Sequence, residues 1–293
     1  MPPKRVEVEV EGHRLSLSNL DKVLYPRAGF TKGQVIDYYT RIAPALLPHL
    51  RDRPLTLKRY PNGVDGQYFY EKNCPSHRPD WVRTERVDKI GYCVCDDLAT
   101  LVWLANLADL ELHPSLSLYE PITRPTVMAF DLDPGPAAGL VECCEVAFLL
   151  RDGLSALGLE SYAKTSGSKG IQVYVPLNVD DVDYDAGTKR LSQALARHLE
   201  AQRPELIVSQ QRKELRKGKV LIDWSQNDEH KTTVCVYSLR ARERPTVSTP
   251  LRWEELTNPE ALVFEAADVL ERVSEHGDLF TPVAEQQQRL PDL

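Results

Sequence analysis

The chain has 293 residues, of which 42% are hydrophobic and 27% charged, as in ordinary soluble enzymes, and this length allows one large mixed α/β domain or two tightly merged lobes. It has no apolar run of about 18 residues, and its start, MPPKRVEVEVEG, lacks the apolar core of a signal peptide, so we expect no membrane span and a cytoplasmic location. The net charge of −7 weakly disfavours a nucleic-acid partner, although basic residues gather at 212–219 and 240–244, either as a local basic groove or as plain solvated faces.

The first half of the chain alternates strand and helix patterns. Strands are predicted at Val6–Val10, Arg14–Leu17, Leu55–Tyr60, Gln67–Glu71, Leu110–His113 and Thr126–Asp133. The turn signal Pro61-Asn62-Gly63 joins the third and fourth of these strands. A capping box at Thr31 begins a helix that runs toward Leu50, where Pro44 and Pro48 break or end it. Asp97 caps a second helix, Leu98–Leu107.

The second half continues in the same mixed manner. Helices are predicted at Leu140–Leu157, 185–201 and Pro259–Val273, and strands at Tyr162–Thr165, Ile171–Leu177, Val220–Trp224 and Thr233–Leu239. The tail from Pro282 is expected to be ordered only where it docks. Because strands and helices interleave without a regular βαβ period, we expect an α+β fold with a mixed or antiparallel sheet and flanking helices, in a single domain over 1–293.

Two aspartates at the end of a hydrophobic strand are the most informative feature of the sequence. In Val127–Gly135, Asp131 and Asp133 point to the same face, because strand side chains alternate. Neighbouring carboxylates repel each other in a partly buried setting, and a divalent cation such as Mg²⁺ or Mn²⁺ removes that cost. An acidic strand end that caps the next helix is the structural alternative.

Two later segments strengthen this interpretation. Asp223 follows three apolar strand residues, a poor place for an unpaired charge, and is either a third metal ligand or one side of a structural ion pair. The loop Thr165–Gly170 contains Ser166 and Lys169 between two strands. Glycines, hydroxyls and a lysine suit a phosphate, although a solvated hairpin turn has the same composition.

Other candidate residues are more ambiguous. His113 ends a strand and could be catalytic or simply a structural hydrogen-bonding group. Of the adjacent Phe69 and Tyr70, one is expected to face the core and the other could stack on a base, while core packing of both is the alternative.

The six cysteines show no paired zinc-ligand spacing. Cys74, His77, Cys93 and Cys95 could form a metal site, but Cys-x-Cys is an unusual half-site. We therefore expect reduced thiols, mostly buried.

Eight segments in order resemble one family: DKVLYP, TKGQVIDYY, KRYPNGVDGQYFYEKN, ELHP, FDLDPG, TSGSKG, LIDWSQN and YSLRAR. Together they are similar to the polymerase domain of bacterial multifunctional DNA ligase D, within the archaeo-eukaryotic primase superfamily. The resemblance implies a primase-polymerase core at about 61–245, an N-terminal DNA-end-binding part at about 1–60 and a C-terminal helical segment at about 250–293. The similarity covers nearly the whole chain.

The resemblance also implies roles for individual residues. Asp131, Asp133 and Asp223 match the ligands of two catalytic metal ions, Mn²⁺ or Mg²⁺. The nucleotide-binding positions match Lys58, His113, Ser166, Lys169, Arg216, Gln226 and Arg240. Phe69 or Tyr70 matches an aromatic residue that packs on the template, and Lys22 and Lys32 match lysines that hold a 5′-phosphate. Gln172 occupies a nucleotide-site position where the family usually has His, and a glutamine carries no proton charge.

The sequence therefore predicts a DNA-repair nucleotidyltransferase that extends a primer 3′-end or fills short gaps, with NTP favoured over dNTP by the resemblance. Its expected partners are gapped DNA or DNA ends with a 5′-phosphate, NTP or dNTP, and Ku with a separate ATP-dependent ligase, but no membrane. The alternatives are a nucleotide-sugar transferase, which also uses an Asp-x-Asp pair with Mn²⁺, and a non-catalytic DNA-end binding module. A phosphatase of the type that uses an Asp-x-Asp pair is disfavoured because Pro134-Gly135 follows the pair here.

The two N-terminal lysines have an independent physical argument. Lys32 lies in the first turn of the helix that Thr31 caps, where a positive charge opposes the helix dipole. Solvent exposure would explain it, but so would a bound phosphate that faces both the lysine and the helix amides. Lys22, ten residues earlier, would supply the second positive charge.

Overall fold

The structure is a computed structural model that describes residues 5–291, so the outermost ends of the predicted domain, 1–4 and 292–293, lie outside the described residues. The chain forms two compact units that interleave along the sequence. Unit 1 contains the residues up to Pro114 with Val234–Val247 and Phe264–Gly277, and unit 2 contains the remainder. These limits do not coincide with the parts predicted at 1–60, 61–245 and 250–293, and the single domain stays a prediction.

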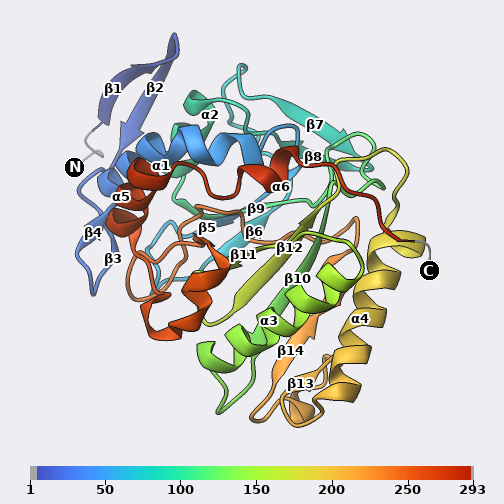
Figure 1. Cartoon of the computed structure of the whole chain (residues 1–293). Coiled ribbons are helices and arrows are strands. Elements are labelled where there is room, and N and C mark those ends of the chain that lie inside the picture. The colour runs from blue at the N-terminus through green and yellow to red at the C-terminus, as the bar shows by residue number, and fades with distance from the viewer. Residues whose placement is uncertain (1–4, 292–293) are drawn as a thin grey trace. The chain divides into compact units, whose positions relative to one another are not determined.

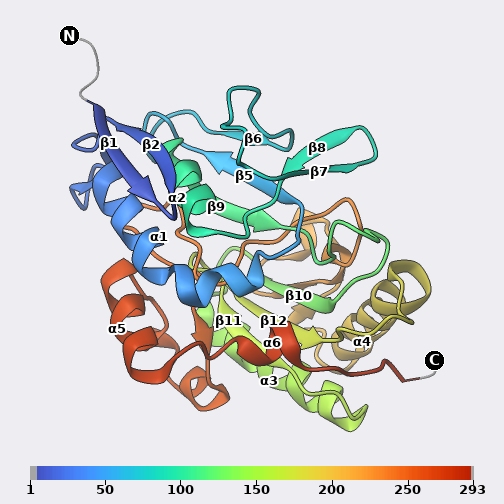
Figure 2. The ribbon, with the colours of Figure 1, turned by 90° about the horizontal axis from the view of Figure 1, so that it is seen from above.

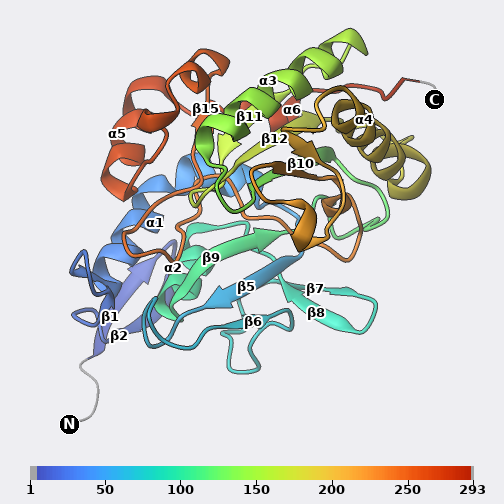
Figure 3. The same ribbon diagram turned by 90° about the horizontal axis from the view of Figure 1, so that it is seen from below.

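Unit 1 is built on a five-stranded sheet with helices. Its strands are β1 (Arg5–Val10), β2 (His13–Ser18), β3 (Val23–Tyr25), β4 (Phe30–Thr31), β5 (Leu55–Arg59), β6 (Phe69–Glu71), β7 (Thr84–Val87), β8 (Ile90–Cys93) and β9 (Asp109–Pro114). Its helices are α1 (Lys32–Leu46), α2 (Leu98–Asn106), α5 (Ala266–His276) and a 3₁₀ turn, Leu47–His49. The sheet has the order β6-β5-β8-β7, and β9 also pairs with β5, as Figure 3 shows. Two hairpins, β1-β2 and β3-β4, complete the unit, and α2 lies beside β2 (Figure 2).

Unit 2 is a six-stranded sheet with two long helices packed against it. Its strands are β10 (Val127–Pro134), β11 (Tyr162–Thr165), β12 (Ile171–Pro176), β13 (Ile207–Val208), β14 (Val220–Asp223) and β15 (Pro250–Leu251). Its helices are α3 (Leu140–Ala156), α4 (Lys189–Gln202), α6 (Thr281–Glu285), a π-helix at Tyr184–Thr188, and 3₁₀ turns at Lys213–Leu215, Trp224–Gln226, Trp253–Thr257 and Pro259–Ala261. The strand order is β13-β14-β10-β12-β11-β15, antiparallel except for the β13-β14 pair. Helices α3 and α4 run along this sheet (Figure 1).

Local signals in the sequence begin the helices of unit 1 as predicted. The Thr31 hydroxyl accepts a hydrogen bond from the backbone N–H of Gln34, and Lys32 is the first helical residue. Asp97 caps α2 by accepting from the backbone N–H of Thr100. Pro44 lies inside α1, which ends two residues later at Leu46. The α+β class with largely antiparallel sheets is confirmed, and across residues 5–291 no helix is long and apolar enough to cross a membrane.

The strand predicted at Thr233–Leu239 is wrong. Tyr237 has a φ of 64°, which breaks the extended backbone, and the N–H of Ser238 bonds back to the carbonyl of Cys235 in a turn. The N–H of Cys235 instead bonds to the carbonyl of Leu112. The segment is apolar because it is buried, and this composition alone resembles a strand.

The helix predicted at Pro259–Val273 is also wrong in its limits. A 3₁₀ turn occupies Pro259–Ala261, and α5 begins only at Ala266, after the carbonyl of Phe264 has accepted a backbone hydrogen bond from Val247. That extended contact prevents a continuous helix. The sequence interpretation also missed the hairpin of β7 and β8 and gave β6 two extra residues.

The expectation of reduced thiols fails for one pair of cysteines. Cys74 and Cys93 form a disulfide, which removes both from the metal site considered with His77 and Cys95. Cys95 is free and buried, as are Cys143, Cys144 and Cys235, in agreement with the prediction for them.

Candidate active site

Three aspartates gather on two neighbouring strands of unit 2. Asp131 and Asp133 alternate with the buried Leu132 on β10, so both lie on the opposite face of the strand from this leucine. Asp223, the last residue of β14, is the direct cross-strand partner of Asp131. Sequence alternation predicted the first pair, and the antiparallel register brings the third aspartate to it.

Asp131 lies beside two other carboxylates and a polar amide. The pKa of Asp131 is raised to about 6, chiefly by burial and also by the neighbouring Asp223 and Asp133 carboxylates, against a hydrogen bond from Gln172 that lowers it. The Gln172 Nε2 donates to Asp131 Oδ1 at 3.1 Å. A partly buried carboxylate beside two others is a setting that favours a bound cation.

The other two aspartates have polar partners of their own. The Arg216 guanidinium lies 3.2 Å from Asp133 Oδ2. Asp223 Oδ1 accepts from the Ser225 hydroxyl at 2.7 Å, and its Oδ2 accepts from the Gln226 Nε2 at 2.8 Å. These contacts connect the predicted nucleotide-site residues Arg216 and Gln226 directly to the acidic face.

The donor chemistry of the three aspartates suits hard divalent cations, since all their candidate ligand atoms are carboxylate oxygens. However, within residues 5–291 no three His, Cys, Asp or Glu side chains converge closely enough to hold a metal ion. Asp133 is directed to Arg216 rather than to the other two carboxylates. Asp131 and Asp223 are cross-strand partners with the donor type that such a metal needs, and Asp133 would have to leave Arg216 to join them.

The Ser166–Gly170 loop is held beside the aspartate strand by close packing. A Cβ on Gly170 would lie 2.1 Å from the carbonyl oxygen of Leu132, so only glycine allows this approach. The Ser166 hydroxyl accepts hydrogen bonds from the backbone N–H groups of Ser168 and Gly170, which closes the loop. Lys169 is exposed at its tip, so its charge is available to an anion.

A second cluster of predicted nucleotide-site residues forms within unit 1 around Glu111. One oxygen of this buried carboxylate lies 3.1 Å from Lys58 Nζ, 3.0 Å from His113 Nε2 and 3.3 Å from Arg240 Nε. Burial alone would raise the pKa of Glu111, but the His113 hydrogen bond and the Arg240 and Lys58 charges hold it well below its usual range. Burial lowers the pKa of His113, against the opposing effect of Glu111.

Aromatic rings cover the lysine of this cluster. Lys58 Nζ lies 4.8 Å from the centroid of the Tyr68 ring and 5.4 Å from that of Tyr70. Both Phe69 and Tyr70 are exposed, at 43% and 57%, so the expectation that one of them faces the core is wrong. Phe69 covers the guanidinium of Arg59, and Tyr68, which the sequence analysis did not select, is exposed at 53%.

The two N-terminal lysines differ in exposure. Lys22 is exposed, and its Nζ donates to the carbonyl of Pro61 at 2.6 Å. Lys32 is only 5% exposed and donates to the carbonyl of Ser18 at 2.6 Å. The pKa of Lys32 is lowered to about 8, chiefly by burial and in smaller part by the charge of Lys22. Exposure alone therefore does not explain why a lysine begins α1.

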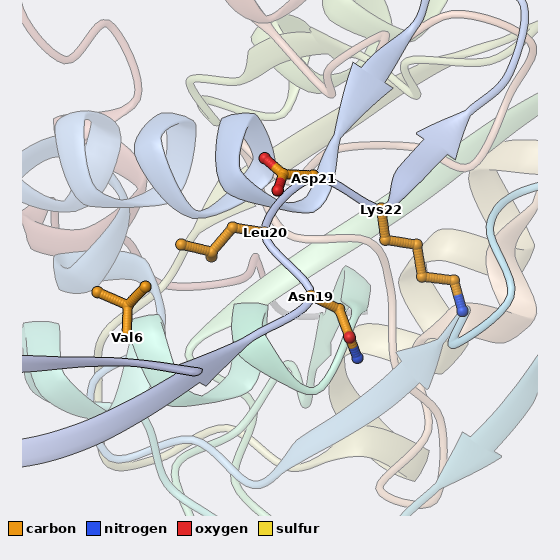
Figure 4. Close-up of a pocket in the computed structure, with 5 residues that line it drawn as sticks. All are labelled: Val6, Asn19, Leu20, Asp21 and Lys22. Carbon is orange, nitrogen blue, oxygen red and sulfur yellow. The ribbon is translucent and has the colours of Figure 1, made fainter. Parts of the chain in front are cut away.

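A pocket of about 460 Å³ adjoins Lys22 (Figure 4). It is lined by Val6, Asn19, Leu20, Asp21 and Lys22. Leu20 extends toward Val6, whereas the Lys22 side chain points away from both. The pocket thus has an apolar wall, an amide, a carboxylate and a cation at the part of the chain predicted to hold a DNA 5′-end.

Sequence inspection missed Glu111 and Lys164 as candidates. Both are charged residues that are almost completely buried, at 2% and 1% exposure. The signal for Glu111 was present, since a charge between two leucines on an apolar strand must find partners when it is buried.

Comparison with known proteins gives one consistent match. The family model for the primase-polymerase domain of LigD matches residues 31–280. The chain is 41% identical over 279 residues to the multifunctional non-homologous end joining protein LigD of Mycolicibacterium smegmatis, covering 92% of this chain and 36% of that protein. It is 33% identical over 265 residues to the bifunctional non-homologous end joining protein LigD of Bacillus subtilis, covering 90% of this chain and 43% of that protein.

A solved structure agrees with these relatives. The polymerase domain from Mycobacterium tuberculosis ligase D, in complex with DNA, superposes with a TM-score of 0.85 at 38% identity, covering 94% of this chain and 99% of that one. The chain thus spans well under half the length of the curated relatives that it matches, but nearly all of the isolated polymerase domain.

Proposed function

The chain belongs to the LigD primase-polymerase domain family, and on this premise we propose that it is a DNA-directed nucleotidyltransferase that extends primer ends or fills short gaps in end-joining repair. The cross-strand opposition of Asp131 and Asp223 carries the proposal, because it concentrates carboxylates on one face beside the Ser166–Gly170 loop. Family membership removes the nucleotide-sugar transferase as an alternative.

Asp131 and Asp223, joined by Asp133, would hold divalent ions, Mn²⁺ or Mg²⁺, two by family expectation. When bound, such ions make the primer 3′-hydroxyl more acidic and neutralise charge on the leaving pyrophosphate. The Ser166–Gly170 loop would hold nucleotide phosphates through the exposed Lys169.

The unit 1 cluster has the charge for the same kind of ligand. Lys58 and Arg240 are cationic, and Glu111 balances only one of these charges. A net positive charge that is already held in place can stabilise negative charge as it develops on a triphosphate. His113, whose Nε2 contacts Glu111, would be fixed in orientation by that contact.

The decisive experiment is extension of labelled gapped DNA with NTPs and Mn²⁺. The wild-type chain should lengthen the primer, while Asp131→Asn and Asp223→Asn should abolish lengthening and keep wild-type circular dichroism. Substantial extension by either folded variant would contradict the proposed role of these aspartates. Binding of gapped DNA by the wild type without lengthening would instead support a non-catalytic DNA-end binding module.

We further propose that Lys22 and Lys32 recognise a downstream 5′-phosphate, with Ku and a separate ATP-dependent ligase as partners in repair. Two lysines could favour a terminal phosphate by about 1–3 kcal/mol, the range of charge-assisted hydrogen bonds. Gap binding should therefore be tighter with a phosphorylated downstream strand, at fixed salt. Equal binding of both strands by the wild type would remove this proposal.

A preference for NTP over dNTP follows from family membership alone. Competition between the two pools in single-nucleotide gap filling measures it. Equal incorporation would show that this chain lacks the preference.

A further inference from the structure

Four polar residues form a row across four adjacent strands of unit 2. Lys164 on β11 is the cross-strand partner of Gln172 on β12, Gln172 is the partner of Asp131 on β10, and Asp131 is the partner of Asp223 on β14. Lys164 and Gln172 are buried, at 1% and 4% exposure. Such a row in the middle of an apolar sheet is stable only if its hydrogen bonds are arranged consistently.

The ammonium group of Lys164 determines that arrangement. An ammonium group can only donate hydrogen bonds, and Lys164 Nζ lies 2.6 Å from Gln172 Oε1 and 2.6 Å from the Ser248 hydroxyl oxygen. The Ser248 hydroxyl donates its own hydrogen to the carbonyl of Thr165, so its oxygen accepts from Lys164. The amide oxygen of Gln172 must therefore face Lys164.

The orientation of Gln172 then follows. With its oxygen directed to Lys164, its Nε2 must point to the other side, where it donates to Asp131 Oδ1 at 3.1 Å. A flipped amide would place N–H groups against the ammonium and an oxygen against the carboxylate, and both contacts would be repulsive.

We propose that Lys164 and Gln172 act as one positioning unit that orients the Asp131 carboxylate for a divalent metal ion. Lys164 fixes the amide, and the amide holds one carboxylate oxygen, which leaves the other for the ion. The neutral Gln172 can take this position because the positive charge is supplied one strand further away, on Lys164. The inference rests on the proposed function, since it concerns a metal at Asp131.

The test measures Mn²⁺ binding to the whole chain by electron paramagnetic resonance of the free ion, without DNA or nucleotide. Lys164→Met and Gln172→Met should each weaken Mn²⁺ binding by about tenfold, as outer partners of metal ligands do. Because the two residues act in series, the double variant should be no weaker than the single ones. Lys189→Met, which removes a lysine paired with Asp185 and Asp228, is the control and should bind Mn²⁺ as the wild type does.

The outcomes separate the two proposals. Single variants that bind Mn²⁺ like the wild type, or losses that multiply in the double variant, would overturn the positioning unit while primer extension still supports the polymerase. A wild-type chain that binds no Mn²⁺ would overturn the positioning unit, while primer extension decides the polymerase separately. If Lys164→Met does not fold, Lys164→Gln serves instead. The new amide can accept hydrogen bonds as well as donate them, so it leaves Gln172 free to flip, and this variant should also weaken Mn²⁺ binding.

Discussion

Replacing Glu111 by Gln removes a buried negative charge on which several donors converge. Lys58, His113 and Arg240 contact one carboxylate oxygen, and the other accepts from the backbone N–H of Ala241 at 3.0 Å. Removing one partner of a buried ion pair costs about 3–5 kcal/mol, because the remaining charges lose their compensation. The glutamine oxygen can keep the Ala241 contact, so we expect the free energy of unfolding to fall by an amount near the lower end of this range, about 3 kcal/mol.

The pH dependence gives this prediction a sign. Burial favours the protonated form of Glu111, but His113, Arg240 and Lys58 together keep its pKa below the ordinary value. A carboxylate with a lowered folded pKa contributes stability above its unfolded pKa of about 4.3, and this contribution is lost as the pH falls through the folded pKa. The free energy of unfolding of the wild type should exceed that of Glu111→Gln by the full amount at pH 7. This difference in stability should shrink below about pH 4.

Urea unfolding followed by tryptophan fluorescence measures both effects. Glu71→Gln is the control, since Glu71 pairs with Arg59 at 2.6 Å but its side chain is 26% exposed, and a change of at most about 1 kcal/mol is expected. If Glu111→Gln costs no more than this control at pH 7, or costs the same at pH 7 and pH 3, the carboxylate does not hold the cluster together.

Three further predictions test other parts of the molecule. Gly170→Ala should destabilise the fold in thermal melts and slow primer extension, because its Cβ would lie 2.1 Å from the Leu132 carbonyl oxygen. The control Gly91→Ala, whose Cβ would meet nothing within 4 Å, should leave stability nearly unchanged. Lys32→Met should stabilise the chain against urea at pH 7, since burial opposes the charged lysine. This gain in stability should fade between about pH 8 and pH 10.5, as the lysine of the folded wild type becomes neutral. An unchanged gain at pH 10.5 would contradict this reasoning. Tyr70→Ala, at a side chain 57% exposed, should leave stability unchanged but weaken template binding in fluorescence anisotropy by about 1–3 kcal/mol, and undiminished binding would exclude stacking.

The sequence by itself determined the features that depend on residues close together in the chain. Alternation along one strand placed Asp131 and Asp133 on the same face, and short-range caps at Thr31 and Asp97 began α1 and α2 where predicted. These features follow from backbone geometry over a few residues, so they need no knowledge of the rest of the fold. The order of eight motifs likewise identified the family.

Only the tertiary structure decided which distant residues meet. The register of β10 with β14 brings Asp223 opposite Asp131, and that of β11 and β12 places Lys164 behind Gln172. The segment Thr233–Leu239 was mistaken for a strand because burial and strand pairing select the same apolar residues. A buried charge such as Glu111 indicates that it has partners. Which side chains these are depends on strand pairing and loop paths, which long-range packing sets.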